Sequence, residues 1–253
     1  MNNKTAILGV AIVAILATGA AQAEIFGGAE FGYALDTNFN GASSTAAQRE
    51  ETIRSYTAYL GNYTPSTSGR SALIMKGDIQ TNRLQETPQL DNNLFSVSVG
   101  SYHAFGAVGS MTTALSARAK RFEDDRRNGE TYGVALGFKQ KVAKGFWFRE
   151  GLTAEYGTAQ VSTGVYDGYG VNASLNWSLP SATLLSLGGG WNRRTYDVLA
   201  GDVRTNTQAT LGVVQEVGKH LYMRLSATRQ NNSANDGSEY DSDVYSAGLG
   251  VNM

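Results

Sequence analysis

The sequence predicts an all-β fold, an antiparallel up-and-down transmembrane β-barrel of about twelve strands with short periplasmic turns and longer extracellular loops. Three observations support this class. The chain starts with the layout of a secretory signal peptide, apolar and polar residues alternate along the rest of it, and the connections between alternating segments differ in length at the two ends. A soluble β-sandwich is the alternative that composition leaves open, but a sandwich does not explain the asymmetric connections.

Residues 1–23 are predicted to be a signal peptide. Lys4 provides the positive start, Ala6–Leu16 is an unbroken apolar run, and Ala21-Gln22-Ala23 offers small residues for cleavage. The apolar run is too short to cross a bilayer as a helix. We therefore expect an exported protein in which residues 24–253 form one barrel domain.

The composition agrees with an exported barrel. The chain has no cysteine, which excludes a disulfide scaffold and a lipid-modified N-terminal cysteine. Hydrophobic residues make up 42%, with 30 glycines and 13 tyrosines, as suits strands that show only every second side chain to lipid. The formal net charge is −1 and no long run of one sign occurs, so we expect no nucleic-acid partner.

Alternation is clearest in the segment from Tyr169 to Leu179. Every odd position in it is apolar, and every even position is glycine, serine or asparagine. Similar segments give an even number of candidate strands, which brings both termini to one side of a membrane. The candidate strands span 25–36, 52–63, 70–82, 91–105, 109–122, 130–142, 145–158, 165–178, 182–197, 203–217, 219–230 and 240–253.

The connections alternate between short and longer polar ones, which is the asymmetry of a Gram-negative outer-membrane barrel. The short connections, assigned to the periplasm, are 64–69, 106–108, 143–144, 179–181 and 218. The longer ones, assigned to the cell exterior, are 37–51, 83–90, 123–129, 159–164, 198–202 and 231–239. We therefore expect the protein in the cell outer membrane.

Aromatic residues near the strand ends are expected to form two girdles where lipid meets water. The periplasmic girdle would contain Phe26, Tyr63, Phe105, Phe146 and Trp177, and the outer one Tyr33, Phe122, Tyr132, Tyr156 and Tyr240.

If the apolar set faces lipid, the opposite set lines the lumen, and basic residues outnumber acidic ones there. Two interpretations stay open: a water-filled pore that favours anions, or a plug in which carboxylates neutralise the basic groups. Glu150 falls on the lipid-facing set, which suggests an irregular register or a bulge at that position. The predicted lining residues are Glu30, Lys76, Asp78, Arg118, Lys120, Arg149, Glu155, Arg194, Arg204 and Arg224, together with Asp36, Lys139, Lys141 and Glu216.

Residues that could support catalysis or metal binding are few. Barrel phospholipases and lipid A deacylases carry a His-x-Ser pair, but neither His103 nor His220 is followed by such a serine. We therefore expect interfacial packing for both histidines and no enzyme activity. No zinc, P-loop or dinucleotide motif occurs, so no cofactor is expected. Two acidic groups could bind cations that bridge lipopolysaccharide, or could simply be solvated charge: Glu123, Asp124 and Asp125, and Asp236, Glu239, Asp241 and Asp243.

Two segments resemble known outer-membrane barrels. The last strand, Tyr245–Met253, resembles the C-terminal strand that the barrel-assembly machinery recognises, with Met253 where that pattern usually has Phe. Residues 32–40 resemble the start of the barrel in surface lipoprotein assembly modifiers, although we find no counterpart of the helical-repeat domain that precedes the barrel in that family. As a whole the chain is similar in size to narrow twelve-stranded channels such as the oligogalacturonate and sialic-acid porins, without their specific signatures.

The sequence thus supports two functional hypotheses. The first is passive diffusion of small solutes through a narrow porin-like channel whose basic lining would favour anions, and the second is a closed structural or surface-interaction barrel that acts through its loops. The expected partners are outer-membrane lipids and lipopolysaccharide, the barrel-assembly machinery during biogenesis, and small solutes.

Overall fold

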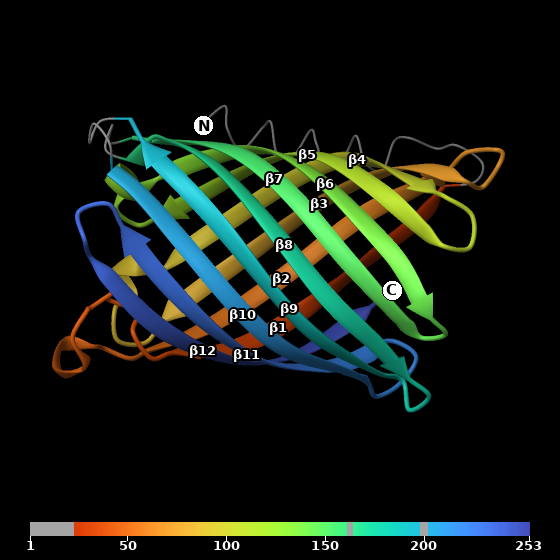
Figure 1. Cartoon of the computed structure of the whole chain (residues 1–253). Coiled ribbons are helices and arrows are strands. Elements are labelled where there is room, and N and C mark those ends of the chain that lie inside the picture. The colour runs from red at the N-terminus through yellow and green to blue at the C-terminus, as the bar shows by residue number, and fades with distance from the viewer. Residues whose placement is uncertain (1–22, 161–163, 198–201) are drawn as a thin grey trace.

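The computed structural model describes residues 23–160, 164–197 and 202–253, and these form one closed β-barrel (Figure 1). Residues 1–22 of the predicted signal peptide lie outside the described residues. The strands are β1 (Glu24–Asp36), β2 (Glu51–Pro65), β3 (Ser71–Leu84), β4 (Asn92–Ala104), β5 (Gly109–Phe122), β6 (Gly129–Ala143), β7 (Phe146–Ala159), β8 (Tyr166–Leu179), β9 (Thr183–Tyr196), β10 (Asp202–Glu216), β11 (Leu221–Ala234) and β12 (Glu239–Asn252). Short 3-10 helices lie in several of the described connections: η1 (Thr45–Ala47), η2 (Pro88–Leu90) and η3 (Asp125–Arg127).

Each strand pairs antiparallel with its neighbours in sequence, and β1 pairs with β12 to close the sheet. Closure matters because an open edge would leave backbone N–H and C=O groups without partners in lipid. The predicted twelve-stranded up-and-down barrel is therefore confirmed. In the part of the chain that the structure describes, no helix is long and apolar enough to span a membrane.

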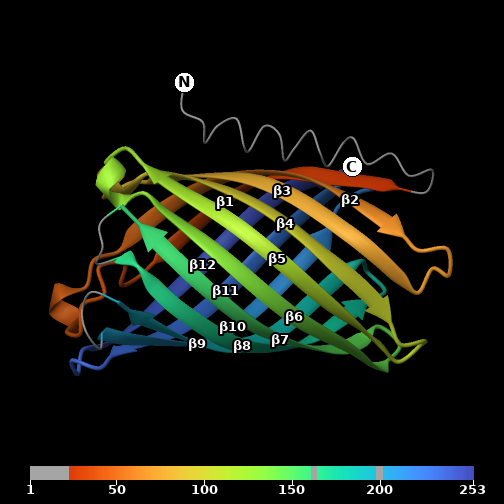
Figure 2. The same ribbon diagram turned by 90° about the horizontal axis from the view of Figure 1, so that it is seen from above.

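The connections differ at the two ends of the barrel, as Figure 2 shows with 37–50 and 123–128 at one end and 66–70 and 105–108 at the other. The remaining turns at the second end, 144–145, 180–182 and 217–220, are all tight. We call this second end periplasmic and the first extracellular, following the asymmetry of outer-membrane barrels.

Predicted and observed strand bounds agree to within two residues, except at the end of the strand predicted at 219–230. Strand β11 continues to Ala234, where it still pairs with Arg204 of β10. The connection predicted at 231–239 is therefore only 235–238. The polar sequence of residues 231–234 resembles a loop, but a strand that extends beyond the lipid can expose polar side chains to water on both faces.

The apolar side chains lie on the outside of the barrel. Leu115, Leu187 and Leu211 are more than half exposed, at 58%, 58% and 57%. Among the described residues only two hydrophobic side chains, Ala72 and Leu84, are buried. This inverted distribution is what a lipid environment selects, because lipid rather than a protein core covers the apolar face.

The predicted aromatic girdles are correct for some residues and wrong for others. Tyr33, Tyr132, Tyr156 and Trp177 are exposed on the outer face. Phe26, Tyr63, Phe122 and Tyr240 instead lie on the inner face. The prediction used the height of each residue along its strand and ignored whether its position is odd or even, which decides the face on which the side chain lies. The outer girdle also includes Tyr169, near the extracellular end of β8, and Tyr56 and Tyr245 are exposed on the outer face as well.

Glu150 points to the outer face in a regular register, directly opposite Phe138 and Ala173. The predicted irregularity at this position is wrong, since the register shift of the β6–β7 pair lies between Lys141 and Ala143. The Glu150 carboxylate accepts a hydrogen bond from Gln140 Nε2 at 3.1 Å. It lies close to the periplasmic end, where a flexible carboxylate can reach hydrated headgroups.

Candidate solute pathway inside the barrel

In each strand, the charged residues predicted to line the lumen stand at the positions that alternate with the exposed apolar residues. Their side chains therefore lie on the inner face. Their neighbours divide them into two groups. Some form ion pairs with carboxylates, and the others have no carboxylate partner. The inner-face set is Glu30, Lys76, Asp78, Arg118, Lys120, Arg149, Glu155, Arg194, Arg204 and Arg224, with Asp36, Lys139, Lys141 and Glu216.

Ion pairs occur on two sides of the interior. Arg194 Nε lies 2.8 Å from Glu155 Oε1, and Arg204 Nη2 lies 3.0 Å from Asp202. Lys76 lies 3.6 Å from Asp78. Each of these pairs keeps contact with water, since the basic side chains are between 42% and 59% exposed.

A further cluster joins β1 to β11 across β12. Arg224 Nη2 and the Tyr222 hydroxyl both donate to the Glu30 carboxylate, the latter at 2.8 Å. The large side chains reach across because β12 has glycine on its inner face here: a Cβ at Gly250 would lie 2.3 Å from the Tyr222 ring, and one at Gly248 would lie 3.0 Å from Glu30 Oε1. The glycines therefore make room for neighbouring side chains at this point.

The same arrangement recurs on the other side of the barrel. Gly168 of β8 lies directly between Glu155 of β7 and Arg194 of β9 in the register. A Cβ at Gly168 would lie 2.9 Å from Glu155 Cγ and 3.3 Å from Arg194 Cγ. An acid, a glycine and an arginine on three successive strands thus form an ion pair that spans the middle strand. Sequence alternation could not reveal this pattern, because the partners lie two strands apart.

The wall formed by β5, β6 and β7 is different. Within the described ranges, none of its five inward basic residues has a carboxylate within ion-pair distance. Lys120 lies over the Phe122 ring at 4.8 Å and Lys139 over the Trp147 ring at 4.6 Å. The unpaired basic residues are Arg118, Lys120, Lys139, Lys141 and Arg149.

Lys139 and Arg149 are direct cross-strand partners. Like charges opposite one another disfavour strand pairing, so this pair carries an electrostatic cost. Arg194 and Arg204 are also direct partners, but each has its own carboxylate. The Lys139–Arg149 pair is therefore an uncompensated concentration of positive charge inside the barrel.

This pair lines a hollow of about 610 Å³ in the periplasmic half of the interior. The other polar groups on the inner face around it are hydroxyls and an amide, which can donate hydrogen bonds to an anion. Glu150, whose side chain points to the outer face, also borders the hollow. One ammonium and one guanidinium group beside several hydroxyls can bind a carboxylate or phosphate. The polar residues of the lining are Lys139, Arg149, Tyr102, Ser110, Thr112, Thr153, Asn172, Ser174 and Glu150.

Two further hollows lie toward the extracellular end. One of about 530 Å³ contains Lys120, and Phe39 and Leu90 reach it from the connections 37–50 and 85–91. The other, of about 320 Å³, is lined by Arg194 and Arg204 together with asparagine and serine residues and two aspartates, Asp202 and Asp236. Hollows with basic residues therefore occur in both halves of the interior.

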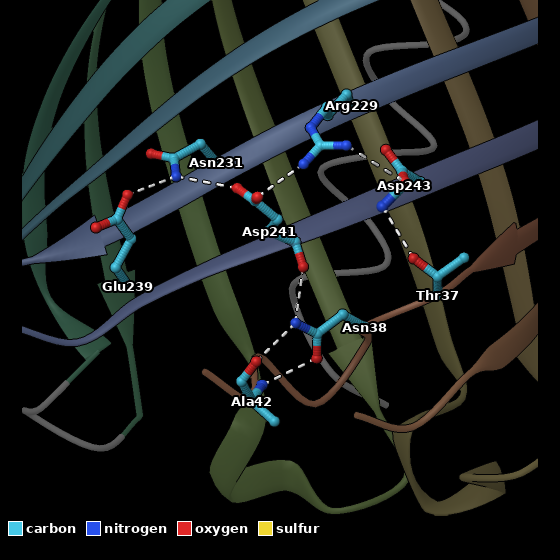
Figure 3. A network of polar contacts seen from close by, with 8 residues as sticks. All are labelled: Thr37, Asn38, Ala42, Arg229, Asn231, Glu239, Asp241 and Asp243. Carbon is cyan, nitrogen blue, oxygen red and sulfur yellow. Dashed lines mark hydrogen bonds and ion pairs between the residues drawn. The ribbon is translucent and has the colours of Figure 1, made fainter. Parts of the chain in front are cut away.

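Two buried polar residues hold the connections that cover the larger extracellular hollow. Asn38, 2% exposed, donates to the backbone oxygens of Ala42 and Asp241 at 2.9 and 2.7 Å (Figure 3). Glu51, 1% exposed, accepts from the backbone N–H groups of Gln85 and Glu86 and from the Thr87 hydroxyl. Both anchors join an extracellular connection to a strand end.

Acidic residues on the outer face of β12 belong to a polar network rather than to a cation site. Asp241 accepts from Arg229 at 2.8 Å and from Asn231 at 3.0 Å, and Asn231 also donates to Glu239 (Figure 3). In the described residues no group of acidic or histidine side chains is arranged to hold a metal ion. In the connection 123–128, the hydrogen bond from Arg126 lowers the pKa of Asp124, which also accepts from the Arg126 backbone N–H at the start of η3.

The histidines lie at the periplasmic end. His103 Nδ1 lies 2.7 Å from Ser71 Oγ, its direct cross-strand partner, and its ring makes an edge contact with Phe105. His220 Nδ1 lies 2.9 Å from the Asn252 carbonyl oxygen. The sequence indicated no serine partner for His103, and strand pairing supplies one. Among the described residues, no carboxylate bonds to His103 to complete a catalytic triad.

Four features of the structure define the class of this protein. The sheet has no open edge, the exterior is apolar, tyrosines lie at the outer rim, and the charges are confined to the interior and the rims. The chain is therefore an outer-membrane β-barrel protein.

No protein-family model and no curated protein matches the sequence. Among solved structures, it is similar to an outer membrane channel from Pseudomonas putida F1, with a TM-score of 0.67 and 10% identity over 90% of this chain and 95% of that one. It is also similar to the β domain of the Bordetella autotransporter Brka, with a TM-score of 0.50 and 10% identity over 91% of this chain and 100% of that one. At identities this low, the structural similarity shows a shared fold alone.

Proposed function

We propose that this protein is a narrow porin-like channel through which small anionic solutes diffuse passively across the outer membrane. The observation that carries the proposal is the unpaired basic wall of β5, β6 and β7, with Lys139 and Arg149 side by side at the 610 Å³ hollow. A charge without a partner in a dry interior costs several kcal/mol or more, so these groups need water or a mobile anion beside them.

The charge pattern favours this function over a salt-bridged plug. A plug requires carboxylates to neutralise the basic residues throughout the interior. The pairs Glu30–Arg224 and Glu155–Arg194 meet that requirement at their positions. The β5–β7 wall does not, and its positive field would raise the local concentration of anions. The Pseudomonas putida structure is described as a channel, which is compatible with the proposal.

Ion selectivity in planar bilayers tests the proposal. The double variant Lys139→Gln, Arg149→Gln should lower the chloride-to-potassium permeability ratio about fivefold, because removing charges near the ion path changes its energy by about 1 kcal/mol. The ratio is measured from the reversal potential in a salt gradient. The matched control Glu155→Gln, Arg194→Gln removes one charge of each sign from the interior and should shift the ratio much less.

Two outcomes would contradict the proposal. Absence of conductance steps from the purified barrel would contradict the channel itself, and wild-type selectivity in the Lys139 and Arg149 variant would contradict the anion preference assigned to these residues. Absence of conductance would favour the second hypothesis, a closed barrel that acts through its extracellular connections.

A further inference from the structure

The outer face of the barrel carries two adjacent arginines at its extracellular end. Arg54 of β2 and Arg83 of β3 are direct cross-strand partners. Both have the parity of the exposed residues Tyr56 and Ile79, so both face outward. They are themselves exposed, with 48% of the Arg83 side chain accessible. This is a second pair of like charges that lie directly opposite one another, on the opposite face from Lys139 and Arg149, and of the two only Arg83 has a carboxylate nearby, Asp91 at 3.7 Å.

Nothing within the described chain neutralises this pair fully. Arg54 has no hydrogen-bond or ion-pair partner there, and Arg83 has only Asp91 at 3.7 Å and the Asn82 carbonyl oxygen. Two other outward arginines at this end are neutralised at close range, since Arg121 lies 2.8 Å from Glu130 and Arg229 lies 2.8 Å from Asp241. Because opposed like charges disfavour pairing, Arg54 and Arg83 would gain from an anion placed between them.

The depth of the pair in the membrane indicates which anion that is. Arg54 lies directly opposite Tyr33, a member of the outer aromatic girdle. Arg193, another outward arginine, also lies opposite a girdle residue, Tyr169. Its Nε is buried without an acceptor in the described structure. Aromatic girdles mark the level of the lipid headgroups. Below the pair, Tyr56 and Ile79 form an apolar surface against which an acyl chain can pack.

We infer that Arg54 and Arg83 together bind the phosphate of an outer-leaflet lipid, of the kind that lipid A carries in lipopolysaccharide. Two guanidinium groups can each donate paired hydrogen bonds to phosphate oxygens, which a single lysine could not reproduce. The anion would remove the repulsion between the arginines, while the acyl chains would cover the apolar surface below them. The inference is independent of the proposed channel, because these side chains lie outside the lumen.

Native mass spectrometry of the full-length barrel in detergent tests this site, with bisphosphorylated lipid A as the titrated probe. The variant Arg54→Gln, Arg83→Gln should bind lipid A at least tenfold more weakly than the wild type, and the wild type should bind dephosphorylated lipid A as weakly as the variant. Folding of the variant is expected to be retained, because the substitution removes a repulsive pair. Its heat-modifiable migration on gels checks this.

Two controls separate the site from general charge effects. Arg118→Gln, Arg149→Gln makes the same change in net charge on the inner face, and Arg121→Gln, Glu130→Gln removes a neutralised pair at the same rim. Both should bind lipid A as the wild type does. Equal weakening by the inner-face control, or wild-type binding that ignores the lipid phosphates, would overturn the inference. Displacement of lipid A by millimolar inorganic phosphate alone would show a simple anion site and would overturn the lipid assignment.

Discussion

At the scale of single residues, three cross-strand pairs of basic side chains differ in what surrounds them. Arg194 and Arg204 each have a carboxylate nearby, at 2.8 and 3.0 Å, so both positive charges of this pair are neutralised. Lys139 and Arg149 inside the barrel lack such compensation, and in the pair on the outer rim only Arg83 has a carboxylate nearby, Asp91 at 3.7 Å. The same local geometry is therefore neutralised within the chain at the first position and leaves positive charge at the others, where the two proposals place an anion.

Asn38 gives a prediction at this scale. Asn38→Ala should speed hydrogen exchange of the Ala42 amide about thirtyfold, since loss of its buried hydrogen bonds costs roughly 2 kcal/mol locally. The Ala42 N–H donates to Asn38 Oδ1 at 2.9 Å, which makes it the direct reporter. Exchange is measured by mass spectrometry of peptides from 37–50. Ser43→Ala, an exposed position in the same connection, should leave exchange unchanged, and equal exchange in both variants would contradict the anchor.

Parity alone predicted on which face each charged residue lies, and the strand register agrees for all of the inner-face set. It could not predict which of them pair. Glu155 and Arg194 meet across Gly168, and Ser71 meets His103 through strand register. Such partners depend on the stagger of neighbouring strands and on the size of the residue between them, neither of which alternation encodes.

At the scale of strands, the inward glycine at position 168 is expected to be structural. Gly168→Val should separate Glu155 from Arg194 and lower the free energy of unfolding by about 1 kcal/mol, in the range for a partly exposed ion pair. The midpoint of heat-modifiable migration on gels measures the loss. Gly190→Val, also on the inner face, is a control, because the nearest atom to a Cβ there is again on a flexible side chain, Gln208 Nε2 at 3.3 Å, and the substitution interrupts no ion pair. Equal losses in the two variants would show that crowding alone is responsible.

Strand positions were predictable from the alternation, whereas the ends of strands at the extracellular rim were less so. The run Asn231–Ala234 contains asparagine and serine yet continues β11. Apolar and polar residues alternate only where a strand contacts lipid. Strands here extend past the lipid into water, where either face can be polar. For the same reason Phe122 and Tyr240, which lie at the correct height for a girdle, could face the interior.

At the scale of the whole molecule, the barrel closes along a short seam. The β1–β12 ladder runs only from Gly28↔Asn252 to Asp36↔Val244. Side chains supplement it: Tyr59 donates to Asn252, Ser242 donates to Asp36, and Tyr222 donates to Glu30. These contacts join residues from opposite ends of the chain, and they reinforce the strand pair that has the fewest register partners.

Glu30 should therefore matter more than an equivalent residue elsewhere. Glu30→Gln weakens the contacts with Arg224 and Tyr222 at the seam, and it should lower the temperature of unfolding more than Glu155→Gln does, by the equivalent of about 1 kcal/mol. Both substitutions keep the side-chain shape, and both remove one ion pair that spans a strand. The measurement is thermal unfolding in detergent micelles, followed by circular dichroism. Equal temperatures for the two variants would show that the seam is no weaker than the rest of the wall.

The seam also constrains how the molecule can be made. Its two edges come from the first and the last strands of the barrel, so every hairpin from β1 to β11 can form while the sheet is still open. Until Val244–Asn252 arrives, two rows of unsatisfied amides remain available to any passing chain. A chain truncated before these residues would lose at once the strand that closes the sheet and the segment that resembles the assembly signal.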